Sequence, residues 1–148
     1  MDQTARLKVV LDTSVLIAAL RAGSGVSAEA LVRILRLDVR LLLSYALLCE
    51  YRDVALRPDQ LRAFQLTAKE VEEVISQVEE LAEPLPFAES YRPLSPDPND
   101  DLVLEAAING RADLVVTHNI RHLREAAARF KIEVVTPPEF LQLLRREE

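Results

Sequence analysis

The stretch KVVLDTSVLIAALRAG, residues 8–23, decides the fold class. Its first four residues form a short apolar run with β-branched side chains, which predicts a buried strand at Lys8 to Leu11. Apolar side chains then recur at helical spacing through residues 15–20, and Gly23 ends that helix. Asp12 therefore lies where a strand passes directly into a helix.

Outward from this stretch, short apolar runs alternate with helical patterns. Runs at 39–43, 114–117 and 132–135 predict further buried strands, and the proline-rich segment 84–98 is a loop or an extended segment that holds one strand near 85–87. Helical patterns cover 27–37, 45–57, 67–81, 101–109 and 123–130, and a last helix begins at Pro137. This alternation indicates an α/β fold with a parallel sheet, and we expect one domain over residues 1–148.

Several residues predict where the helices begin and end. Ser44 is suited to an N-cap, and Thr67 with Glu70 forms a capping box. Pro58 is expected to close one helix and Gly110 another.

Composition limits the class of protein. The chain has 148 residues, 49% of them hydrophobic, and 18 basic against 24 acidic side chains give a net charge of −6. An acidic balance argues against nucleic-acid binding through bulk positive charge, and three glycines leave no glycine-rich phosphate loop. A single cysteine fits a reducing compartment, and no apolar run reaches the length of a membrane span. We therefore expect a cytoplasmic protein without a membrane segment.

Polar side chains follow each expected strand. They are Asp12, Thr13 and Ser14 after the first strand, Glu50 on the helix after the second, Asp97, Asn99, Asp100 and Asp101 after the proline-rich segment, and Thr117, His118 and Asn119 after the strand at 114–117. Because the carboxyl ends of parallel strands share one edge of a sheet, we expect these side chains to gather there.

Each acid has a structural alternative. Asp12 suits an N-cap, and Glu50, whose helical neighbours are apolar, could pair with Arg52 or Arg57. One acid in a first helical turn complements the helix dipole, but Asp97, Asp100 and Asp101 together exceed that need. Such a group of hard oxygen ligands suits Mg²⁺ or Mn²⁺.

Other chemistries fit the sequence less well. His118 and His122 have a spacing seen in zinc sites, but no further zinc motif accompanies them. Cys49 is expected to be a buried structural cysteine rather than a nucleophile. A phosphatase of the haloacid dehalogenase type needs an acid where this chain has Ser14, and the paired acids of a receiver domain are not evident.

The segments VVLDTSVLIAAL and DPNDDLVLEAAINGRADLVVTHN, with a glutamate on the helix after the second strand, resemble the PIN domain of metal-dependent ribonucleases. The resemblance is closest to the VapC-like toxins of toxin–antitoxin pairs. It implies a three-layer α/β/α fold with a central parallel sheet of about five strands, and an acidic pocket that binds Mg²⁺ or Mn²⁺. Carried over by position, Asp12, Glu50 and Asp101 are the catalytic and metal-binding acids, with Asp97 or Asp100 assisting.

The resemblance also assigns Thr13, Ser14 and Thr117 as pocket hydroxyls. At the fourth acidic position, where many family members carry aspartate, this chain has Asn119, which can hold a water but brings no charge. The expected activity is metal-dependent cleavage of RNA, and the expected partners are a cognate antitoxin protein and a second copy of the chain. The alternative is a binding module with a weakened metal site. The arginines expected to contact RNA are Arg21, Arg52, Arg121 and Arg124.

Overall fold

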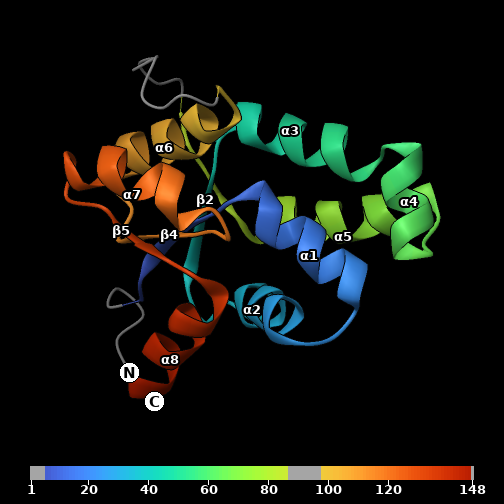
Figure 1. Ribbon diagram of the computed structural model, residues 1–148, viewed down its shortest axis with the longest axis horizontal. Helices are drawn as coiled ribbons and strands as arrows, with labels where there is room; N and C mark the ends of the chain where they lie inside the picture. The colour runs from blue at the N-terminus through green and yellow to red at the C-terminus, as the bar shows by residue number, and fades with distance from the viewer. Residues whose placement is uncertain (1–5, 87–97, 148) are drawn as a thin grey trace.

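The computed structural model describes residues 6–86 and 98–147 (Figure 1). In this part of the chain a five-stranded sheet forms from β1 (Lys8–Leu11), β2 (Arg40–Leu43), β3 (Glu83–Pro84), β4 (Leu114–Val116) and β5 (Glu133–Val135). The strand order is β3-β2-β1-β4-β5, and every pairing is parallel. The expected parallel sheet of about five strands is confirmed.

Helices cover both faces of the sheet. They are α1 (Thr13–Ala22), α2 (Val26–Leu35), α3 (Tyr45–Ala55), α4 (Pro58–Phe64), α5 (Ala68–Leu81), α6 (Pro98–Gly110), α7 (Ile120–Ala128) and α8 (Pro137–Glu147). In Figure 1, α6 and α7 lie above the strands and α2 and α8 below them, while α3, α4 and α5 extend to one side together with α1. The fold is therefore a three-layer α/β/α sandwich, as expected.

The core explains the continuous apolar runs in the sequence. Val9, Val10 and Leu11 of β1 are fully buried, and no residue of β4 is more than 3% exposed. Strands in the middle of such a sheet are covered on both faces, so they need apolar side chains at every position rather than at alternate ones.

Most helix boundaries match the sequence. The Ser44 hydroxyl accepts a hydrogen bond from the Leu47 amide at 3.1 Å, and the reciprocal capping box of Thr67 and Glu70 is present. Gly23 ends α1 in the left-handed conformation, with φ of 68°.

Two boundaries differ from the sequence-based expectation, and one glycine has a different conformation. Pro58 does not merely close α3 but is a first-turn residue of α4, a short helix that the sequence pattern did not predict. Helix α6 ends at Gly110, as expected, but the left-handed residue is Arg111, with φ of 52°. Gly110 instead permits close packing, because a Cβ there would lie 2.6 Å from a methyl group of Leu42. The expected strand near 85–87 occurs at 83–84, and residue 87 lies outside the described part.

The topology decides where a ligand can bind. From β1 the chain moves outward to β2 and β3, then returns to the other side of β1 to form β4 and β5. The strand order reverses between β1 and β4, and open α/β sheets bind ligands at the carboxyl ends of the strands that flank such a point. Asp12 directly follows β1 and Thr117 directly follows β4, so both lie there.

Within residues 6–86 and 98–147, no single helix is long and apolar enough to cross a membrane, although α1 and α2 together, bent by 111°, reach that length and composition.

Candidate active site

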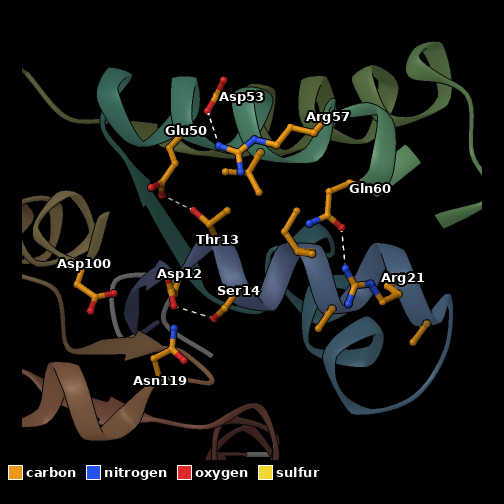
Figure 2. A pocket seen from close by; sticks show the side chains of 14 residues that line it. Asp12, Thr13, Ser14, Arg21, Glu50, Asp53, Arg57, Gln60, Asp100 and Asn119 are labelled. Atoms are coloured by element: carbon orange, nitrogen blue, oxygen red, sulfur yellow. Dashed lines mark hydrogen bonds and ion pairs between the residues drawn. The ribbon is translucent and has the colours of Figure 1, made fainter. Parts of the chain in front are cut away.

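A cavity of about 580 Å³ opens at the reversal point, between α1, α3 and the start of α6 (Figure 2). The polar side chains at its inner end are Asp12, Thr13, Ser14, Glu50, Asp100 and Asn119. They come from the ends of β1 and β4, from the helix after β2 and from the first turn of α6. The expected gathering of strand-end side chains at one edge of the sheet is therefore observed for these six residues.

Asp12 is fixed by hydroxyl groups on two strand ends. Its side chain is 5% exposed, and its Oδ2 atom accepts hydrogen bonds from Ser14 Oγ at 2.7 Å and Thr117 Oγ1 at 2.6 Å. Asp12 occupies the N-cap position of α1, yet its side chain makes no capping hydrogen bond. The carboxylate is thus held by the pocket hydroxyls rather than used to cap the helix.

Glu50 faces the same cavity from α3 and accepts a hydrogen bond from Thr13 Oγ1 at 2.5 Å. The two arginines considered as its partners are bound elsewhere. Arg52 pairs with Glu72 and Glu79 of α5, and Arg57 pairs with Asp53 at 3.0 Å. Neither of these ion pairs involves Glu50.

Asp100, not Asp101, lines the cavity. Both carboxylates are 3% exposed, but consecutive residues of a helix point about 100° apart, so the two side chains face different surroundings. Figure 2 shows Asp100 directed toward Asp12 and Asn119. Asp100 is therefore our proposed third acid of the pocket in place of Asp101, and Asp97 lies outside the described residues.

The segment after β4 is held by short hydrogen bonds. The backbone N–H of Asn119 donates a hydrogen bond to Thr117 Oγ1 at 2.9 Å. The hydroxyl that donates to Asp12 therefore also positions the backbone of Asn119. His118 Nε2 lies 2.9 Å from Ser27 Oγ, whereas His122 Nδ1 lies 4.0 Å from Asp100 Oδ2. The two histidines contact different partners, so they do not form the shared face that a zinc site requires.

The carboxylates give the inner end a negative field. The pKa of the buried Tyr51 hydroxyl is raised well above its usual value, mainly by burial and further by the charges of Asp12 and Glu50. Within the described ranges, no three His, Cys, Asp or Glu side chains stand close enough together to enclose a metal ion. The acids instead surround the cavity from separate walls, as mutually repelling charges do.

The arginines expected to bind RNA are divided among three places. Arg21 lines the cavity, whereas Arg52 is bound to α5. Arg121 and Arg124 line a second cavity of about 780 Å³, which shares Asn119 with the first.

The sequence did not predict that Asp53, Arg57 and Gln60 line the cavity, and it misplaced one cysteine. Asp53 and Arg57 belong to α3 and the turn that follows it, whereas Gln60 depends on α4, which the sequence pattern did not predict. Cys49 is exposed, contrary to the expectation of a buried structural cysteine, because it lies on the solvent side of α3 while Leu47 and Leu48 face the core.

Comparison with known protein families now bears on this site. A family model described as the PIN domain matches residues 8–121. The chain belongs to the PIN domain family. The match runs from β1 into α7, so it includes all three acids of the pocket and Asn119.

Two solved structures share the fold of this PIN domain. One is a chain of VapBC2 from Rickettsia felis bound to a DNA fragment from the promoter, with 15% identity, a TM-score of 0.62 and coverage of 88% of this chain and 98% of that one. The other is a chain of VapBC-1 from nontypeable Haemophilus influenzae, with 18% identity, a TM-score of 0.58 and coverage of 89% and 99%. A comparison with curated proteins found no match.

Proposed function

We propose that this PIN domain is a divalent-metal-dependent endoribonuclease. The observation that carries the proposal is the meeting of Asp12, Glu50 and Asp100 around one cavity, although they come from three separate parts of the chain. If these acids only capped helices or faced solvent, three of them from distant segments would have no reason to share one cavity with the Asn119 side chain, because their charges repel.

The donor set fits Mg²⁺ or Mn²⁺. Carboxylate and amide oxygens are the hard ligands these ions prefer, and no thiolate is in the cavity. Because the three carboxylates stand on separate walls, Asp12, Glu50 and Asp100 would hold the ion partly through bound water, as Mg²⁺ sites with one or two direct carboxylate ligands do. Asp12 is already oriented by two hydroxyl donors. When bound, such an ion makes water a nucleophile at neutral pH and shields the negative charge of a phosphate.

The protein side chains have separate tasks in this proposal. Glu50, fixed by Thr13, orients the attacking water, and Asn119 holds a further water through its side-chain amide. Ser14 and Thr117 keep the Asp12 carboxylate aimed at the cavity, since both donate a hydrogen bond to it. Because Asn119 carries no charge, we expect a second ion to bind weakly or not at all.

The proposed biological role is that of a toxin in a toxin–antitoxin pair. The sequence resembles VapC-like toxins, and two of the solved structures that share the fold are described as VapBC. An antitoxin protein and a second copy of the chain are therefore proposed partners, RNA is the proposed substrate, and the cytoplasm is the proposed location.

The second candidate is a PIN domain that binds RNA or protein without cleavage. The uncharged Asn119 favours it, because a site with one carboxylate fewer holds a divalent ion less tightly. The two candidates differ in metal binding. An intact site predicts that millimolar Mn²⁺ raises the melting temperature, whereas a degenerate site predicts no shift.

The test is cleavage of labelled single-stranded RNA in EDTA, Mg²⁺ or Mn²⁺, with Asp12→Asn beside the wild type. We expect cleavage that requires the ion and disappears in Asp12→Asn, while the circular dichroism spectrum of the variant stays that of a folded protein. Cleavage that persists in the variant would point to a contaminating nuclease. No cleavage and no thermal shift would favour the binding module.

A further inference from the structure

The cavity continues beyond the acids as a groove between α1 and α3 (Figure 2). Helix α1 contributes one face of its surface, with Thr13, Ile17 and Arg21 spaced four residues apart. Helix α3 contributes the opposite wall, in which Glu50 and Val54 are spaced in the same way. Each wall therefore presents successive helical turns to the same groove.

The groove changes character along its length. Its inner end is acidic, its middle is apolar at Ile17, Ala18 and Val54, and its outer end is basic. At 1.5 Å per residue, Arg21 lies roughly 12 Å along α1 from Thr13. The groove thus carries a cationic side chain at the end that lies away from the acids.

The charge at the outer end belongs chiefly to Arg21. Its guanidinium donates a hydrogen bond to the neutral Gln60 Oε1 at 2.7 Å, and it makes no ion pair within residues 6–86 and 98–147. Arg57, which also lines the cavity, is paired with Asp53 at 3.0 Å (Figure 2). Gln60 therefore orients a cation whose charge is uncompensated, and α4 is the element that supplies Gln60.

We propose that this groove binds the RNA strand beside the cleavage position, with a backbone phosphate at Arg21 and a base over Ile17 and Val54. The inference rests on the proposed function, because the acidic end is taken as the place of cleavage. A nucleic acid strand matches the order of the groove, since the sugar that links one phosphate to the next carries a base with apolar faces. Recognition of the phosphate by Arg21 is independent of base identity.

The experiment measures RNA binding rather than cleavage. The probe is a fluorescein-labelled single-stranded RNA of about ten nucleotides, titrated with wild type, Arg21→Ala and Arg62→Ala in EDTA and followed by fluorescence anisotropy. Arg62 is the matched control, because it is also an exposed arginine in the last turn of a helix but does not line the groove. Both substitutions remove the same charge.

We expect Arg21→Ala to weaken binding about tenfold or more and to reduce the slope of log affinity against log salt by about 0.7, the contribution of one phosphate contact to a single strand. Arg62→Ala should stay within about twofold of the wild type. Equal effects of the two variants, or wild-type binding in Arg21→Ala, would overturn the proposal and leave the groove to a protein segment.

Failure of this inference is separable from failure of the proposed nuclease. Metal-dependent cleavage that needs Asp12, combined with full RNA affinity in Arg21→Ala, would retain the nuclease and reject the groove as the RNA track. Selective loss of RNA affinity in Arg21→Ala, without cleavage by the wild type, would retain the groove and reject the nuclease.

Discussion

Asp100 and Asp101 are neighbours on α6 with the same burial, yet they face different surroundings. We predict that Asp100→Asn lowers RNA cleavage by roughly 100-fold or more, since loss of an outer-shell partner alone costs a metal site 10–100-fold. Asp101→Asn should retain cleavage within about tenfold. The measurement is the initial rate of RNA cleavage at saturating Mn²⁺.

The same two variants also show whether the loss of activity comes from lost metal binding. The Mn²⁺-induced rise in melting temperature should disappear in Asp100→Asn and remain in Asp101→Asn. If Asp101→Asn were the inactive variant that no longer responds to Mn²⁺, the reassignment of the third acid would fail.

Thr117 acts on the pocket through Asp12. Its side chain is fully buried and donates to Asp12 Oδ2 at 2.6 Å, so Thr117→Val removes the hydroxyl at nearly constant shape. We predict that Mn²⁺ affinity falls about 10- to 100-fold, as it does when a partner of a metal ligand is lost. Calorimetric titration of Mn²⁺ measures the change, and Thr117→Ser, which keeps the donor, should restore most of the affinity. Equal affinities of the valine and serine variants would show that the hydroxyl does not orient Asp12.

At this scale the sequence identified residue types better than side-chain directions. Asp12, Glu50 and Asn119 could be placed because each follows a strand that the apolar runs define. The choice between Asp100 and Asp101 could not be made, because it depends on the rotation of α6 about its own axis. That rotation is fixed by packing of α6 against β1, β2 and other helices, which a local sequence pattern does not contain.

At the scale of elements, α4 shows that one residue type can favour two different helix boundaries. A proline ends a preceding helix and also favours the first turn of a new one, and at Pro58 both occur within a few residues. The strands were predictable because their burial on both faces leaves continuous apolar runs. The short helix α4 was not predictable in this way, so the position of Gln60 at the outer end of the groove could not be inferred from the sequence.

Helix α5 was predicted from its capping box, which the structure contains in both directions. We predict that Thr67→Ala lowers the free energy of unfolding by about 1 kcal/mol, because the amide of Glu70 loses its acceptor. For a chain of this length that corresponds to a fall of about 2–4 °C in melting temperature. Thr67→Ser should be close to the wild type, and an alanine variant as stable as the wild type would mean that water replaces the cap at no cost.

At the scale of the molecule, the sheet order and the cavity have one cause. The chain fills the sheet outward from β1 in one direction and then in the other, so the ends of β1 and β4 lie side by side. Asp12 and Thr117, which are 105 positions apart, meet where β4 pairs with β1. The candidate active site therefore depends on long-range packing, and conditions that loosen the packing of α3 on β1 should disturb it.

Tyr51 joins α3 to β1 and makes that packing sensitive to alkaline pH. Its fully buried hydroxyl donates to the carbonyl of Leu11, the residue before Asp12, and burial raises its pKa well above the usual value of about 10. Unfolding exposes the phenol, which then loses its proton near pH 10 while the folded form keeps it. The stabilisation is thus fully present below about pH 10 and is lost as the pH rises toward the folded-state pKa.

We predict that Tyr51→Phe lowers the free energy of unfolding at pH 7 by about 1–3 kcal/mol, because the Leu11 carbonyl loses its buried donor. The variant should also lose much of the fall in stability between pH 9 and pH 11 that the wild type shows, since it has no phenol to ionise on unfolding. Urea unfolding across this range measures both effects. Tyr45→Phe is the control, because Tyr45 begins the same helix but is 80% exposed. If Tyr51→Phe lost stability with rising pH as steeply as Tyr45→Phe, ionisation of Tyr51 could not be the cause of the alkaline instability.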